Sequence, residues 1–130
     1  MPNTRINISS GAPWENTVGY SRAVRIGNLI EVSGTTSVDG EKVIYPGDAY
    51  GQTRYILEKI EKALHEAGAS CKDVIRTRIY TTDISNWEDI GKAHGEFFKT
   101  IRPAATMVEV RALINPELLV EIEVTAVVQE

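Results

Sequence analysis

The sequence predicts an α+β fold, a two-layer sandwich in which one mostly antiparallel β-sheet carries two helices on one face. The last strand is the clearest, because apolar and polar residues alternate strictly from Val120 to Ala126. Apolar residues recur at helical spacing in two other segments, 56–67 and 87–98. Each of these segments connects two strand patterns, so both helices are expected to lie on the same face of one sheet.

The elements of the first half follow from alternation and from turn residues. The expected order is a short edge strand at Arg5–Ile8, a loop at 9–13, a hairpin formed by 21–26 and 29–33 around Gly27-Asn28, and a turn at 38–41.

In the second half the helical period begins near Asp48 and ends at Gly68, where a left-handed C-terminal cap belongs. A strand follows at 74–80. The second helix is expected to start near Ser85-Asn86 and to be stopped by Pro103. Two strands then close the chain.

Helices on one face leave the other sheet face uncovered, so we expect that face to become a subunit interface. The residues expected in the core are Val24, Ile26, Val32, Val108 and Val120 from the strands, with Ile56, Ile60, Leu64, Ile90 and Phe97 from the helices.

Composition limits the class of protein. A length of 130 residues suits a single domain, 1–130, and 42% apolar with 25% charged residues is ordinary for a globular protein. The net charge of -4 argues against a general nucleic-acid binder. The single cysteine, Cys71, excludes an intrachain disulfide, and no apolar run is long enough for a bilayer. Residues 1–7 contain no apolar signal core, so we expect a cytoplasmic protein without a membrane partner.

Glu121 and Glu123 lie side by side on the polar face of the last strand. Water, a partner subunit or a ligand must account for that face. A carboxylate in such a place would position water for attack if burial raised its pKa, whereas the plainer interpretation is a solvated strand face.

The C-terminal segments Arg102-Pro103-Ala104, Val108-Glu109-Val110 and 119–123 together resemble the RidA family, also called YjgF. Further matches, at 24–34, 67–69, 73–74 and 82–83, extend the resemblance over nearly the whole chain from about Tyr20. The resemblance implies the chorismate-mutase-like fold of that family.

The resemblance also implies a function. Members hydrolyse reactive imines and enamines, need no metal or bound cofactor, and are homotrimers with a ligand cleft at each subunit interface. Glu121 matches the glutamate that orients the attacking water, while Tyr20, Ser33 and Gly34 match residues that contact the ligand. An arginine that grips the substrate carboxylate is replaced here by Ala105, which implies a divergent branch with an altered substrate range.

The missing arginine raises the question of which cation replaces it. Ala105 shares its strand face with Met107, so Met107 is expected to contact substrate on the same side. Arg78 is the first candidate for the cation, and an ion pair with a glutamate is the alternative. Arg22 is a weaker candidate, because its hairpin is expected to point it into solvent.

Three other residues have both a functional and a structural interpretation. His94 would be an acid or base, but a hydrogen-bonded helix histidine is favoured; Cys71 would be a nucleophile, but an ordinary thiol is favoured. Trp14 would cap the cleft or plug a neighbouring subunit. No ligand spacing for a metal is present.

Three functions remain open. The first is an enzyme that hydrolyses a small reactive imine or enamine, and the second is a non-catalytic trimer that binds a small metabolite. The third is an endoribonuclease, which the net negative charge of the chain supports least.

Overall fold

The computed structural model describes residues 4–129. One sheet has the strand order β1-β2-β3-β8-β6-β7, and β6 pairs with β7 in parallel while the other neighbours pair antiparallel. Its strands are β1 (Arg5–Ile8), β2 (Ala23–Ile26), β3 (Leu29–Thr36), β6 (Val74–Thr81), β7 (Ala104–Glu109) and β8 (Val120–Val127).

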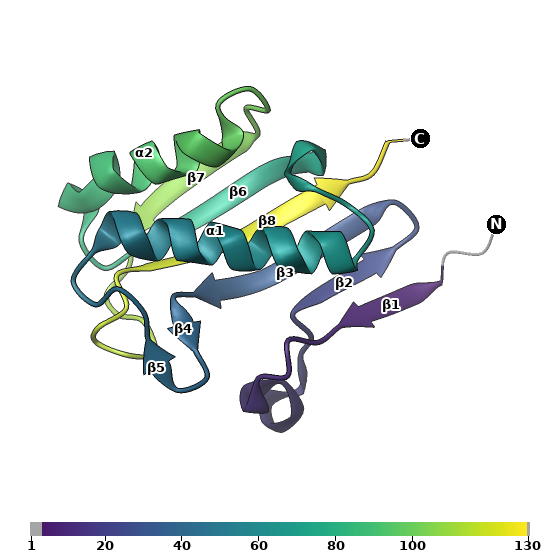
Figure 1. The fold of residues 1–130 in the computed structure, drawn as a ribbon, viewed down its shortest axis with the longest axis horizontal. Coiled ribbons are helices and arrows are strands. Elements are labelled where there is room, and N and C mark those ends of the chain that lie inside the picture. The colour runs from purple at the N-terminus through teal and green to yellow at the C-terminus, as the bar shows by residue number, and fades with distance from the viewer. Residues whose placement is uncertain (1–3, 130) are drawn as a thin grey trace.

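Two helices, α1 (Ala49–Glu66) and α2 (Trp87–Phe98), lie side by side over one face of this sheet (Figure 1). The predicted two-layer α+β fold is therefore confirmed. Residues 1–3 and 130 of the predicted domain 1–130 lie outside the described residues. Residues 1–3 are also part of segment 1–7, which was expected to lack an apolar signal core. No helix in the described range is long and apolar enough to cross a membrane.

The ends of α1 are where the sequence predicts them. The Asp48 side chain accepts a hydrogen bond from the Gly51 amide at 2.8 Å, which satisfies one of the free amides of the first turn. After the helix, Gly68 adopts a φ of 85°, a conformation that favours glycine.

Short elements fill the connections. The predicted turn at 38–41 belongs to a hairpin of β4 (Val38–Asp39) and β5 (Lys42–Val43). Alternation did not predict the π-helical turn Glu15–Gly19 or the 3₁₀ turns Cys71–Asp73 and Ile84–Asn86.

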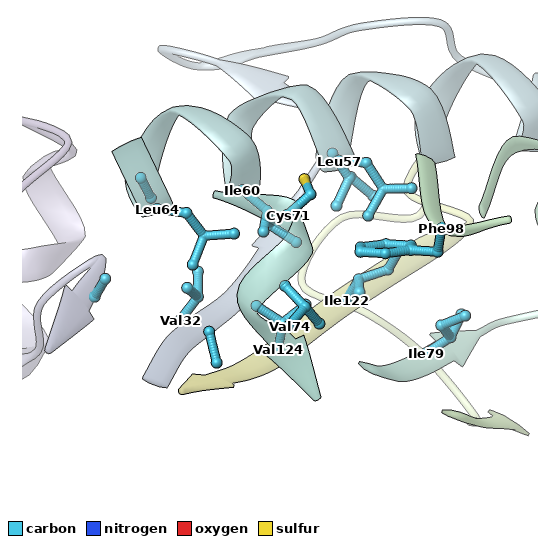
Figure 2. Close-up of a cluster of buried hydrophobic side chains, with 14 of the residues drawn as sticks. Val32, Leu57, Ile60, Leu64, Cys71, Val74, Ile79, Phe98, Ile122 and Val124 are labelled. Atoms are coloured by element: carbon cyan, nitrogen blue, oxygen red, sulfur yellow. The ribbon is translucent and has the colours of Figure 1, made fainter. Parts of the chain in front are cut away.

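The core lies between the helices and the sheet (Figure 2). Most of the expected core residues are confirmed as buried, namely Val32, Val120, Ile56, Ile60, Leu64 and Ile90. Phe97 is only partly buried, and its neighbour Phe98 takes the core position.

The prediction of a core position is wrong for three residues, Val24, Ile26 and Val108. In β2 it is Ala23 that is buried, and Arg25 shares its face because the guanidinium donates to the Ala67 carbonyl at the end of α1 at 2.8 Å. Val24 and Ile26 therefore point to the uncovered face. Val108 lies on that same face, since it pairs with Tyr80 rather than with a buried residue.

The uncovered face, here called the open face, is mixed in character. Ile26, Leu29 and Val108 expose 41%, 47% and 42% of their surface on it, next to charged side chains such as Arg78 and Glu123. That this face is a subunit interface stays a prediction.

Candidate functional site

Glu121 lies on the open face of β8, where it pairs with Thr36 of β3 and Tyr80 of β6. Opposite it, β3 contains one extra residue, because the register shifts between Val32 and Thr35. The resulting bulge brings Gly34 directly under the carboxylate. A Cβ at Gly34 would lie 2.2 Å from Glu121 Oε2, so only glycine leaves room for the acid.

The Glu121 carboxylate is more basic than an ordinary glutamate. Burial raises its pKa, the neighbouring charge of Glu123 raises it further, and the charge of Arg22 lowers it in part. Among residues 4–129, none donates a hydrogen bond to this carboxylate. Its oxygens are therefore available to accept a hydrogen bond from water or a ligand.

Glu123, one step along the same face, is differently placed. Its Oε1 accepts a hydrogen bond from the Tyr80 hydroxyl at 2.9 Å and lies 3.8 Å from Arg78 Nε. The two neighbouring acids thus differ, since Glu123 has protein partners and Glu121 has none in the described chain.

Arg22 contacts Tyr20, Ser33 and Gly34, and of these three Gly34 lies against Glu121. The Arg22 guanidinium donates through Nη1 to the Gly34 carbonyl at 2.9 Å and lies 5.6 Å from the centre of the Tyr20 ring. The Ser33 hydroxyl donates to the Ser21 carbonyl at 2.6 Å, which fixes the start of the bulge.

Arg22 itself does not point into solvent, so that expectation is wrong. Its Nη1 also donates to the Thr35 hydroxyl at 2.8 Å, and Thr35 is fully buried. The carbonyl that the bulge turns outward gives the guanidinium a partner that a regular hairpin would not offer.

Arg78 makes a local ion pair. Besides the contact with Glu123, its Nη1 lies 3.4 Å from the Thr125 hydroxyl. Both members of the pair are about one third exposed, at 37% and 34%. Arg78 and Ser33 also line a shallow depression on the open face together with Val24, Glu31 and Glu123. The ion-pair interpretation of Arg78 therefore holds within one chain.

Ala105 and Met107 lie on the other side of the sheet from Glu121. Ala105 pairs with Thr77, whose hydroxyl is 2.9 Å from His94 Nε2 on α2, and Met107 packs against the core. A single chain therefore does not join the Ala105 side of β7 to the Glu121 carboxylate.

The structural interpretations of His94 and Cys71 are supported. Burial lowers the pKa of His94, and its ring packs 4.7 Å from that of Phe98. The Cys71 thiol lies 3.7 Å from a Glu61 carboxylate oxygen, and burial raises its pKa to about 12. Trp14 is 61% exposed, which leaves both interpretations of its role as predictions.

Two charged residues near the site were missed. Glu15 is buried and accepts hydrogen bonds from the Ser9 hydroxyl and the Ser10 amide, which anchors the segment before Tyr20. Lys59 donates to the Thr36 and Val38 carbonyls, and its burial lowers its pKa to about 8. Glu15 belongs to no periodic pattern, and Lys59 was expected only as one of the polar residues opposite the apolar stripe of α1, so the sequence offered no signal for these contacts.

No group of three or more His, Cys, Asp or Glu side chains in the described range could hold a metal ion. What the fold and site define is a small α+β protein with a half-buried, unpartnered carboxylate beside a glycine bulge. The profile of the Endoribonuclease L-PSP family matches residues 11–128. The chain therefore belongs to this family, which is the RidA or YjgF family that its motifs resemble.

Individual relatives agree with the family. The crystal structure of Rv2704 from Mycobacterium tuberculosis, a member of the YjgF/YER057c/UK114 family, is 53% identical, with a TM-score of 0.89 over 96% of this chain and 100% of that one. The 3-aminoacrylate deaminase RutC from Acinetobacter baylyi is 38% identical over 104 residues, 79% of this chain and 82% of RutC. The uncharacterized protein SCO2049 from Streptomyces coelicolor is 36% identical over 119 residues, 92% of this chain and 89% of its own.

Proposed function

We propose that the protein hydrolyses small reactive imines and enamines to a carbonyl compound and ammonia, with Glu121 as the base that activates water. The observation that carries this proposal is the half-buried Glu121 carboxylate. Its pKa is raised, and no described residue donates a hydrogen bond to it. A base of this kind is suited to proton transfer near neutral pH. The similarity to a protein named a deaminase, RutC, supports the same class of reaction.

The proposed chemistry uses one carboxylate twice. The imine reacts in its protonated iminium form. Water adds to the carbon of the C=N bond while Glu121 accepts a proton from it, so a carbon–oxygen bond forms, the π electrons of the C=N bond move to nitrogen, and the nitrogen becomes a neutral amine. Protonated Glu121 then returns the proton to that nitrogen. The carbon–nitrogen bond breaks and ammonia leaves with the bonding electron pair, while the Glu121 carboxylate accepts the hydroxyl proton as the carbonyl forms. Glu121 then passes this proton to the departing ammonia or to water and returns to its starting state. An enamine enters after protonation on carbon, and neither a metal nor an organic cofactor is required.

We also propose that the site is completed between neighbouring copies in a homotrimer. Glu121 and Gly34 lie on the open face, whereas Ala105 and Met107 lie on the opposite side of edge strand β7. A cleft that contains both groups requires a second copy. The exposed apolar residues of the open face supply surface that such an assembly would cover.

The substrate range follows from Ala105. A methyl side chain cannot hold a carboxylate by two parallel hydrogen bonds, as an arginine fork does. Within one chain Arg78 does not replace that fork, because it is paired with Glu123. We propose substrates whose C=N group lacks an adjacent carboxylate, or which hold that carboxylate differently. A lone reduced cysteine suits the cytoplasm as the place of the reaction.

The test is ammonia release from imines that an amino-acid or amine oxidase generates in the presence of the assembled protein. Acceleration over the spontaneous rate, with a loss on the order of a hundredfold in Glu121→Gln, is expected. Glu58→Gln is the matched control, because Glu58 lies exposed on α1 and is 58% accessible. Spontaneous rates with both carboxylate-bearing and neutral imines would refute the proposal.

A non-catalytic trimer that binds a small metabolite is the second candidate, and Ala105 is the observation that favours it. An enzyme loses turnover in Glu121→Ala, whereas a binder keeps its ligand. A ligand that survives purification, detected by native mass spectrometry, together with no turnover would select the binder.

Endoribonuclease action, which the family description names, is the third candidate. The net charge of -4 gives it the least support. RNA cleavage that persists in repurified Glu121→Ala would indicate a contaminating nuclease.

A further inference from the structure

Arg22 occupies an unusual place for a residue at the start of the hairpin of β2 and β3. Its backbone amide donates to the Ile8 carbonyl of β1 and its own carbonyl accepts from the Ser33 amide, which fixes the main chain on both sides. From this fixed point the side chain reaches the bulge in β3. There it donates to the Gly34 carbonyl at 2.9 Å and to the Thr35 hydroxyl at 2.8 Å.

The bulge that Arg22 holds is the surface on which the Glu121 carboxylate lies. Gly34 is close enough to Glu121 Oε2 that a Cβ would come within 2.2 Å, so a small movement of Gly34 moves the acid. The guanidinium contacts the same glycine through its carbonyl. Gly34 therefore contacts both Arg22 and Glu121 and connects the two side chains.

We infer that Arg22 is a positioning residue for Glu121: it fixes the Gly34–Thr35 bulge beneath the carboxylate and places a positive charge near it. The inference rests on the proposed deaminase function, in which Glu121 activates water. It assigns to Arg22 an indirect role, through Gly34 and through charge.

The charges around Glu121 are consistent with this role. After burial, the charge of Glu123 on β8 raises the pKa of Glu121, and the charge of Arg22 lowers it. The pKa of Tyr80 on β6 is raised by its hydrogen bond to Glu123, and the charge of Glu121 adds to that effect. Lys59 from α1 lies behind the bulge, where its ammonium donates to the Thr36 carbonyl. Arg78 on β6 is paired with Glu123, so Arg22 is the cation whose charge lowers the pKa of Glu121, and its removal takes that effect away.

A purely structural role for Arg22 fits the contacts less well. Its Nε is, among the described side chains, the one buried nitrogen or oxygen without a hydrogen-bond partner. A buried donor left unpaired carries a desolvation penalty. An incompletely paired guanidinium of this kind is typical of residues held for function rather than for stability alone.

The experiment compares Arg22→Gln with wild type by two readouts. The first is the pKa of the Glu121 carboxyl, measured by ¹³C NMR titration of protein with labelled glutamate and assigned with Glu121→Gln. The second is the pH dependence of kcat/KM for imine hydrolysis. In Arg22→Gln the pKa of Glu121 is expected to rise, because a nearby positive charge is lost. The acidic limb of the pH profile of kcat/KM should then move to higher pH, and kcat/KM should fall on the order of tenfold.

Arg25→Gln is the matched control, since Arg25 lies three residues further along, in β2, and donates to Ala67 of α1 on the helix-covered face. This variant should lose some thermal stability and keep the wild-type pH profile. If Arg22→Gln does not fold, Arg22→Lys keeps the charge but not the two-point contact. It should keep the position of the acidic limb and lose several-fold in kcat/KM.

The outcomes separate this inference from the proposed function. An active wild type whose acidic limb and rate are unchanged in Arg22→Gln would overturn the inference and leave the deaminase proposal intact. A raised Glu121 pKa in Arg22→Gln, with no imine hydrolysis by wild type, would support the placement of Arg22 and refute the reaction. For Arg22→Lys, an unchanged rate would overturn the positioning role.

Discussion

The close contact between Gly34 and Glu121 makes Gly34→Ala the sharpest perturbation of the site. The new Cβ would lie 2.2 Å from Glu121 Oε2 and 3.1 Å from Cδ, whereas ordinary contacts begin at 3.4 Å. The carboxylate must therefore retreat by about 1.2 Å, the difference between 3.4 and 2.2 Å. A misplacement of that size costs about a hundredfold in rate when the displaced group reacts.

Stability should change little in the same variant. Gly34 is not in the left-handed region, so alanine fits its backbone and removes about 0.4–1 kcal/mol of unfolded-state entropy. A displaced Glu121 rotamer costs a similar amount, about 0.5–1.5 kcal/mol. The melting temperature should stay within about 5 °C of wild type.

The assay is imine hydrolysis alongside thermal melting, with Gly95→Ala as the matched control. A Cβ at Gly95 on α2 would meet no atom within 4 Å, so this variant should keep its activity. Gly34→Ala with at least a third of wild-type kcat/KM would refute the claim that Glu121 acts from its place over the bulge.

Three further predictions concern the core and the buried titratable groups. Ile122→Ala should lose about 2–5 kcal/mol of unfolding free energy in urea, because Ile122 is fully buried; a loss below about 1 kcal/mol would contradict its core position. Because burial lowers the folded-state pKa of His94, the unfolded state binds more protons below about pH 6.5. The unfolding free energy should therefore decrease as the pH is lowered below that point, and it should decrease less steeply in His94→Gln than in wild type; equal slopes would contradict the burial of this ring. Cys71, with a pKa raised to about 12, should react with iodoacetamide at pH 8 far more slowly in folded than in urea-unfolded protein, and equal rates would contradict its burial.

Local patterns were sufficient for much of the fold. The alternation of 120–126 and the stripe of α1 are periodic over long segments, and Asp48 and Gly68 mark helix ends through their own backbone chemistry. These features depend on neighbours within a few residues. The strand and helix types were therefore predictable without knowledge of tertiary contacts.

The face of the sheet on which each residue of β2 lies was not predictable in this way. Its four residues, Ala-Val-Arg-Ile, place Ala23 and Arg25 on one face and Val24 and Ile26 on the other, and two branched apolar residues are the usual choice for a core. Arg25 faces the helices because the end of α1 offers it a carbonyl. That partner is 42 residues away in the chain, beyond any local pattern.

The site was predictable only in its residue types. Glu121, Ser33 and Gly34 were found through the family motif, but the extra residue in β3 that joins them depends on pairing with β8. The orientation of Arg22 depends on the carbonyl that this bulge exposes. The face of Ala105 is set by parallel pairing of β7 with β6, which alternation within β7 cannot reveal.

A crystal structure of the assembled protein soaked with a small keto acid or neutral ketone tests the central claim most directly. The account predicts a homotrimer with the ligand between two copies, its carbonyl within hydrogen-bond distance of Glu121 or of a water bound to it. The Ala105 side of β7 from the neighbouring copy should line the same cleft. A monomer, or an assembly in which Glu121 faces bulk water and the ligand binds elsewhere, would contradict the account.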